Sequence, residues 1–158
     1  MLNLNEIVRG GTFCLSKAGL KIGNGDAKDV DIAAPNGAGI DFCINGVFVY
    51  HLADGQDKPL TVHATQAALT TCIYLVCLDA AGTLSSVKGE EVLTADLTAG
   101  TAVLQFPTPV ADTCPIGYIK VATAAATTFT TGTTDLSAAG ITDTYVDLFA
   151  IPAAPLTS

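Results

Sequence analysis

Tryptophan is absent from this 158-residue chain, and aromatic residues make up only 6% of it. Charge is scarce as well: Asp, Glu, Lys and Arg reach 14% together, whereas a typical soluble domain carries about 25%. The mean hydropathy is +0.47. An exterior this poor in charge is typical of two kinds of protein, those that contact a membrane and those that bury much of their surface against other subunits.

Long apolar runs are also missing. A membrane-spanning helix needs about 20 successive apolar residues, and the best runs, at 42–50 and 72–78, are much shorter. The first residues, MLNLNEIVRGG, lack the apolar core of a signal peptide. We therefore expect no membrane contact, and instead a subunit of an oligomer or of a larger assembly.

Clustered positive charge is lacking too. The net charge is −8, and no two of the seven Lys and Arg residues are adjacent. Binding to a nucleic-acid backbone uses clustered cations that displace counterions from phosphates. We therefore expect no nucleic-acid partner.

A sustained helical periodicity of apolar residues is lacking, and this favours strands over helices. Short alternating or apolar runs, separated by Gly, Asn, Asp and Pro, predict an all-β chain. The expected strands span 11–16, 19–23, 29–34, 39–44, 46–52, 58–63, 69–79, 82–88, 101–106, 114–123, 127–131 and 143–149. Segment 92–102 predicts a helical turn or a loop. Asn45-Gly46, between two of the strands, is a strong hairpin signal, and Asp79 to Gly82 predicts a second hairpin.

These elements predict one β domain at 11–149, an N-terminal arm at 1–10 and an extended C-terminal tail at 150–158. The domain is expected to be an antiparallel sandwich or a jelly-roll-like barrel, and the sequence does not choose between them. The tail contains two prolines, which oppose a helix. The arm has an apolar side suited to docking on a neighbour, formed by Leu2, Leu4, Ile7 and Val8.

Five cysteines are present, at positions 14, 43, 72, 77 and 114. The odd number and the length of the chain argue against a disulfide framework and favour reduced thiols. Cys72 and Cys77 are five residues apart in the run TTCIYLVCLD, so on a strand they point to opposite faces. They cannot bind one metal together, and both faces of this strand are apolar. We expect a strand that is central in its sheet, or one whose outer face meets another subunit, with both cysteines acting as small buried apolar residues.

Residues with catalytic or metal-binding chemistry are few. His51 and His63 could in principle bind a metal with Asp54 or Asp57, but YHLADGQDKPLTVH lacks the ligand spacing of a calcium loop, and a polar hairpin loop is the simpler interpretation. No GxSxG motif marks a nucleophile, each cysteine lies in apolar sequence, and Glu90 and Glu91 fit a solvated turn. We expect no catalytic residue, no metal site and no cofactor.

Two longer segments are similar to a known class of proteins. IYLVCLDAAGTLSSVKGEEV and CPIGYIKVATAAATTFTTGTTDLSAAGITDTYVDLF resemble virion structural proteins of tailed bacteriophages, in which a YLV-LD-x-G-T strand pair is followed by P-x-GY-x-KV and F-x-x-G-T-T-x-L. The resemblance covers roughly residues 70–149. The matching residues are Tyr74, Leu75, Val76, Leu78, Asp79, Gly82, Thr83, Pro115, Gly117, Tyr118, Lys120, Val121, Phe129, Gly132, Thr133, Thr134 and Leu136.

This class includes head decoration (cement) proteins, and related modules occur in fibres and baseplates. The resemblance implies a non-enzymatic protein that is made in the host cytoplasm and then binds the outer surface of the capsid, where it bridges neighbouring major capsid subunits. It also implies a homo-oligomer, with a trimer expected. The alternative is a tail-fibre or baseplate module that binds a host receptor. The first 69 residues show no such resemblance, which leaves the place in the virion open.

Overall fold

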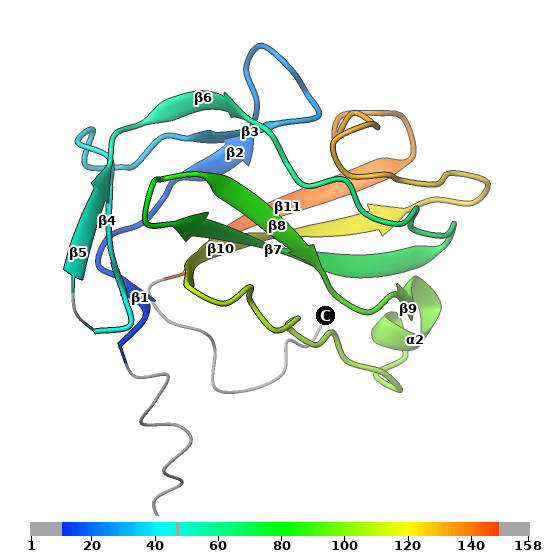
Figure 1. Ribbon diagram of the computed structural model, residues 1–158. Coiled ribbons are helices and arrows are strands. Elements are labelled where there is room, and N and C mark those ends of the chain that lie inside the picture. Colours follow the sequence, from blue (N-terminus) through cyan, green and yellow to red (C-terminus); the bar gives the residue numbers. More distant parts are fainter. Residues whose placement is uncertain (1–10, 47, 149–158) are drawn as a thin grey trace, which may run out of the picture.

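The computed structural model describes residues 11–46 and 48–148. In this part of the chain the expected all-β, antiparallel fold is confirmed (Figure 1). Every strand pair is antiparallel, and the strands form three open sheets, none of which closes into a barrel. The arrangement is compatible with the sandwich alternative. The expected arm at 1–10 and tail at 150–158 lie outside the described residues and stay predictions.

The main sheet has the strand order β11-β10-β7-β8, and β9 also pairs with β7. Its strands are β7 (Thr70–Asp79), β8 (Leu84–Lys88), β9 (Val92–Leu93), β10 (Thr113–Thr123) and β11 (Ile141–Asp147). The second sheet, here called the β4 sheet, consists of β1 (Phe13–Cys14), β4 (Ile40–Ile44) and β5 (Phe48–Leu52). The third, the β3 sheet, consists of β2 (Leu20–Ile22), β3 (Val30–Ile32) and β6 (Gly55–Lys58).

Each face of the main sheet carries an apolar core within this one chain. The β4 and β3 sheets pack on one face, where side chains such as Phe42, Ile32 and Tyr74 share a large apolar core. The other face carries a smaller core, which includes Ile73 and Leu104. This second core is covered by the segment that contains the short helix α2 (Thr94–Thr98) and the coil after it (Figure 1). β7 is therefore a central strand, as one of the two sequence-based alternatives proposed.

The two turn predictions are confirmed. Asn45 and Gly46 have φ values of 56° and 71° in the turn between β4 and β5, where Ile44 pairs with Phe48. Asn and Gly are the residue types that adopt a positive φ most readily. In the β7–β8 hairpin, the Asp79 carboxylate accepts hydrogen bonds from the N–H groups of Ala81 and Thr83. Gly82 has a φ of 77° in this turn. Turn chemistry visible in the sequence thus sets the register of both hairpins.

Three expected strands are wrong, in whole or in part. The strand at 58–63 stops at Lys58, because Pro59 has no N–H with which to continue the ladder. Segment 101–106, which leads into Pro107, is coil apart from a single bridge residue, Leu104, whose side chain is buried. Segment 127–131 contributes one isolated bridge, between Phe129 and Gln66. Each segment contains a buried apolar side chain, as a strand does, but none of them pairs with one of the named strands of residues 11–46 and 48–148 beyond Lys58.

A bulge in β10 changes which side chains face which core. The pairing register with β7 shifts between Pro115 and Gly117. Cys114 and Ile116 therefore share the larger core with Ile119, although Ile119 is an odd number of residues further along. Pro115 sits at this irregularity, where a missing N–H is tolerated. No helix in the described part of the chain has the length and apolarity to cross a membrane.

Candidate functional site

β1 is the first described strand after the predicted docking arm in the chain. Leu2, Leu4, Ile7 and Val8, the residues expected to dock, lie outside the described residues. The chain that follows them alternates: Cys14 is buried in the larger core, whereas Phe13 and Leu15 are 40% and 47% exposed. Two large apolar side chains thus face outward directly after the arm. We call this pair the β1 apolar surface.

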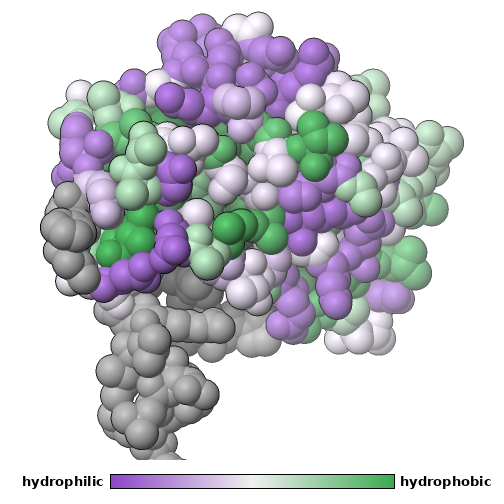
Figure 2. All heavy atoms as spheres, viewed as in Figure 1, coloured by the Kyte–Doolittle hydropathy of each residue, from purple (hydrophilic) through white to green (hydrophobic). Residues whose placement is uncertain are grey.

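Other exposed large apolar side chains are spread over the molecule. They are Val62, Leu69, Leu93, Val103 and Val110. In Figure 2, polar residues gather at the top of the view, over β6 and the β2–β3 turn, and separate apolar patches lie lower on the same face. The β2–β3 turn contains Asp26 and Asp29, and β6 contains Asp57. The exterior therefore combines a polar end with apolar side chains elsewhere.

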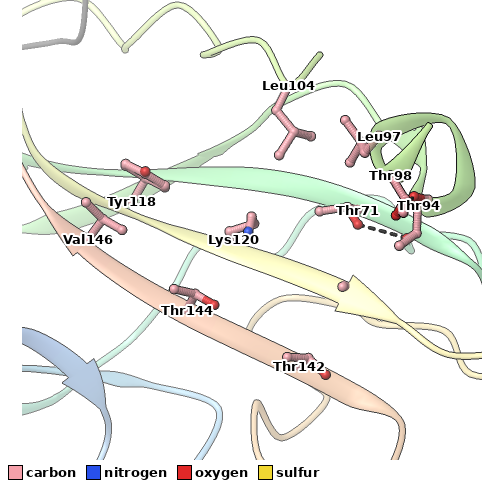
Figure 3. Close-up of a pocket in the computed structure, with 11 residues that line it drawn as sticks. Thr71, Thr94, Leu97, Thr98, Leu104, Tyr118, Lys120, Thr142, Thr144 and Val146 are labelled. Carbon is pink, nitrogen blue, oxygen red and sulfur yellow. Dashed lines mark hydrogen bonds between the residues drawn. The ribbon is translucent and has the colours of Figure 1, made fainter. Parts of the chain in front are cut away.

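A groove of about 290 Å³ lies on the half of the main sheet that the coil after α2 leaves uncovered (Figure 3). Its floor comes from β10 and β11, and Leu97 and Leu104 stand above it (Figure 3). Threonine hydroxyls dominate its polar lining, from Thr71, Thr94, Thr98, Thr142 and Thr144. We call it the threonine groove.

Lys120 is the charged residue of the threonine groove. Its side chain lies between the strands and α2, and no carboxylate within the described ranges forms an ion pair with it. Three of the threonine hydroxyls already have a partner: those of Thr71 and Thr94 are 2.9 Å apart, and that of Thr98 donates to the Thr94 carbonyl oxygen. The groove thus offers a positive charge, hydroxyl groups and an apolar wall, and none of these is a nucleophile with a base beside it.

The cysteines of the central strand behave as the sequence predicts. Cys72 belongs to the larger core and Cys77 to the smaller one, on opposite faces of β7. Burial raises the pKa of each thiol to about 11. A thiol with such a pKa is protonated at neutral pH and is a poor nucleophile or metal ligand. Both residues are therefore core residues.

The two histidines are far from forming a shared site. His51 Nδ1 lies 2.7 Å from Asp41 Oδ1 on the β4 sheet, whereas His63 Nε2 lies 2.9 Å from the Ser86 carbonyl oxygen. Asp54 accepts a hydrogen bond from the Ala34 N–H, and Asp57 accepts two from the β2–β3 turn. Among residues 11–46 and 48–148, no three His, Cys, Asp or Glu side chains gather as metal ligands.

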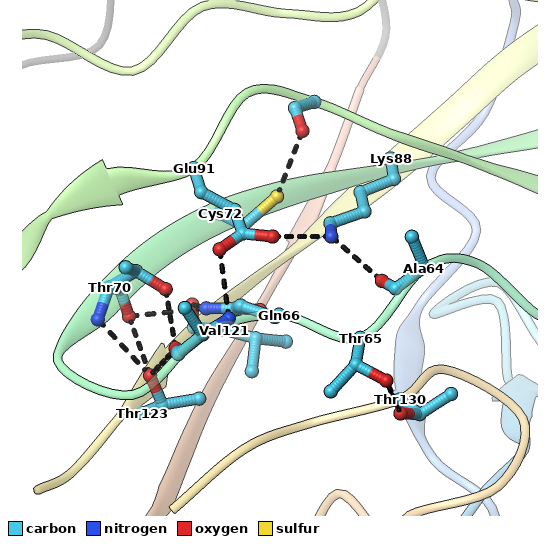
Figure 4. Close-up of polar contacts among 12 residues, drawn as sticks. Ala64, Thr65, Gln66, Thr70, Cys72, Lys88, Glu91, Val121, Thr123 and Thr130 are labelled. Carbon is cyan, nitrogen blue, oxygen red and sulfur yellow. Dashed lines mark hydrogen bonds and ion pairs between the residues drawn. The ribbon is translucent and has the colours of Figure 1, made fainter.

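Glu91 is more than a solvated turn residue. Its carboxylate pairs with the Lys88 ammonium and accepts a hydrogen bond of 2.8 Å from the Ala67 N–H (Figure 4). Lys88 also donates to the carbonyl oxygen of Ala64. This arrangement ties the coil before β7 to the end of β8, so its role is structural.

Two structural features could not be predicted from the sequence. Gln66 is completely buried, although it lies in a coil segment. Cys14 Sγ and Cys114 Sγ are 3.8 Å apart, although 100 residues separate them in the chain. Nothing in the local sequence marks either contact, because both depend on how distant strands pack. The threonine groove had a weak signal, which is the alternation of Thr142 and Thr144 along β11.

No protein-family model matches this chain, and no curated protein and no solved structure matches it either.

Proposed function

We propose that this chain is a structural protein of a tailed-bacteriophage virion, which binds the outside of the capsid and bridges neighbouring major capsid subunits. It is made in the host cytoplasm, assembles as a homo-oligomer, with a trimer favoured, and performs no catalysis. The observation that carries the proposal is the β1 apolar surface, with Phe13 and Leu15 facing outward directly after an apolar arm.

The scarcity of charge supports this role. A permanent interface buries about 2,000 Å² or more and is rich in apolar groups. A chain with 14% charged residues can supply such a surface at low desolvation cost. Its net charge of −8 gives it no attraction to packaged DNA. Most soluble oligomers are closed assemblies with cyclic or related symmetry, and a trimer would match a three-fold axis of a shell.

The resemblance to virion proteins supports the same role. The two resembling segments contain β7, β8, β10 and β11, which are neighbours in the main sheet. The similarity thus falls on one continuous structural unit, and the β1 apolar surface lies on a different sheet. In the proposed arrangement, the main sheet provides the rigid body and the N-terminal region makes the contact.

The proposal is tested by heating capsid shells that lack the protein, with and without purified protein added. We expect the added protein to raise the temperature at which the shells fail. The double variant Phe13→Ser/Leu15→Ser should lose most of this protection and keep its own unfolding temperature, because both side chains are substantially exposed. Val62→Ser, at a side chain that is 62% exposed, is the matched control and should protect fully. Equal failure temperatures with and without the wild-type protein would contradict the proposal.

The threonine groove favours a second candidate function, which is binding of a host receptor by a tail-fibre or baseplate module. Its Lys120, which has no ion-pair partner among the described residues, and its hydroxyl groups offer contacts to a polar ligand. In this case the purified protein should attach to host cells by itself, and Lys120→Ala should weaken attachment. Attachment to cells without any effect on shells would replace the first proposal with this one.

A further inference from the structure

The Cys14 and Cys114 thiols form the one sulfur–sulfur contact among the five cysteines, all of which lie in the described part of the chain. Cys14 belongs to β1 and Cys114 to β10, and their Sγ atoms are 3.8 Å apart. Both are almost fully buried, with 4% and 0% exposure. The contact joins the β4 sheet to the main sheet.

The other cysteines have no such partner. Cys72 lies in the same core as Cys14 but bonds to backbone carbonyl groups, including that of Gly89. Cys77 faces the smaller core, on the opposite side of the main sheet. Cys43 pairs in register with Phe13, so its side chain points to the other face of the β4 sheet from Cys14. Only one pair of thiols in the described part of the chain is therefore placed for bond formation.

We propose that Cys14 and Cys114 are a modification site, at which a disulfide bond forms when the folded protein meets a disulfide oxidant such as glutathione disulfide. The Cys14 thiolate attacks one sulfur of glutathione disulfide, which gives a mixed disulfide and releases one glutathione. The Cys114 thiolate then attacks the Cys14 sulfur and releases the second glutathione. The two protein thiols lose two electrons and two protons, and one glutathione disulfide becomes two glutathione thiols.

Access to Cys14 depends on local opening of β1. This strand has two residues and pairs only with β4 within the described residues. One backbone hydrogen bond on each side extends the pairing, from the Leu15 N–H to the Asp41 carbonyl oxygen and from the Gly46 N–H to the Gly11 carbonyl oxygen. Such short elements open without global unfolding. In the closed form, the hydrogen bond with Cys114 and burial both raise the pKa of Cys14, so the Cys14 thiol is unreactive there. Oxidation therefore proceeds through the open form, at a rate set by how often β1 opens.

The bond would fasten β1 to the centre of the main sheet. It would close a loop of 100 residues, and long loops lose the most conformational entropy in the unfolded state when they are closed. The midpoint of thermal unfolding should rise by about 5–10 °C. This inference does not depend on the proposed function, because it concerns the chain by itself.

The experiment compares full-length protein incubated with glutathione disulfide and with reduced glutathione, both in the native state and during refolding from denaturant. We expect the intact mass to fall by the mass of two hydrogen atoms, and the number of free thiols per chain to fall from five to three. Peptide mapping without reductant should find Cys14 joined to Cys114. Cys14→Ala and Cys114→Ala should each abolish the bond, whereas Cys72→Ala, at an equally buried thiol, should still form it.

Either of two results would overturn the proposal. One is retention of all five thiols in both the native and the refolded sample. The other is a disulfide that joins a different pair in the peptide map. The map of the wild-type protein decides the matter even if an alanine variant fails to fold.

Discussion

The Tyr74 hydroxyl donates a hydrogen bond of 3.0 Å to Gln66 Oε1, and both side chains are completely buried. The Gln66 amide nitrogen donates in turn to the carbonyl oxygens of Thr70 and Val121, at 3.1 Å each (Figure 4). The Gln66 backbone also pairs with Phe129. One glutamine thereby connects β7, β10 and two coil segments through hydrogen bonds that are all shielded from water.

Replacing Gln66 should strongly destabilise the protein. Gln66→Leu removes the hydrogen bonds that it makes to the Val121 carbonyl group and the Tyr74 hydroxyl, and a buried polar group left without its partner costs about 1–3 kcal/mol. We expect the free energy of unfolding to fall by about 3 kcal/mol, measured by urea denaturation. Gln105→Leu, at an exposed glutamine, is the control and should change stability by less than about 0.5 kcal/mol. Equal effects of the two variants would refute the role assigned to Gln66.

Tyr74 and Gln66 should also be energetically coupled. Tyr74→Phe removes one donor to Gln66 Oε1 and should cost about 1–2 kcal/mol. Once Gln66 is leucine, the hydroxyl has lost this partner, so its removal should cost less. A double-mutant cycle should therefore give a coupling energy of about 1 kcal/mol. Strictly additive effects would show that the hydrogen bond contributes nothing to stability.

Cys72 and Cys77 should contribute independently to the stability of the protein. Each is completely buried, but in a different core on a different face of β7. Cys72→Ala and Cys77→Ala should each lower the free energy of unfolding by about 1 kcal/mol, through lost packing. The double variant should lose the sum to within about 0.5 kcal/mol and keep its docking function. Loss of docking in a variant that remains folded would assign chemistry to these thiols.

Stability should depend on pH through Glu91. Burial raises the pKa of this carboxyl, but the hydrogen bonds from Lys88 and the Ala67 N–H outweigh it and hold the pKa below its ordinary value. In the unfolded chain, the pKa of this carboxyl is about 4.3. A lowered folded pKa stabilises the protein fully above that pH, and the contribution is lost as the pH falls through the folded value.

The variant Glu91→Gln isolates this effect. Its deficit in free energy of unfolding should be constant at neutral pH and should shrink as the pH falls below about 4.3, when measured by urea denaturation over a pH series. Glu90→Gln, at an exposed neighbour, should have a smaller effect throughout. A Glu91→Gln deficit that stayed the same down to a pH of about 2.5, well below the ordinary carboxyl pKa, would contradict the assignment.

Local chemistry made the hairpins and the central strand predictable. Asn45-Gly46 and Asp79 to Gly82 carry the turn preferences of their backbone geometry, and the apolar run around Cys72 indicates burial on both faces. Coil segments with one buried apolar residue were not predictable. Leu104 and Phe129 are apolar residues among β-branched neighbours, as in strands, but their burial comes from packing against a sheet formed elsewhere in the chain.

The candidate site was only partly predictable for the same reason. The exposure of Phe13 and Leu15 follows from strand alternation around Cys14. The partnership of Cys14 with Cys114, and the burial of Gln66, require contacts between segments that are distant in sequence. A single sequence gives the residue types but not these distances.

Co-sedimentation with capsid shells that lack the protein tests the central claim most directly. Purified protein is titrated onto a fixed amount of shells, and the bound amount is measured against the major capsid protein. We expect saturable binding at a fixed ratio, which would also report the symmetry of the docked oligomer. Deletion of residues 1–9 should abolish binding and leave the β domain folded. Protein that stays in the supernatant at every concentration would contradict the capsid role.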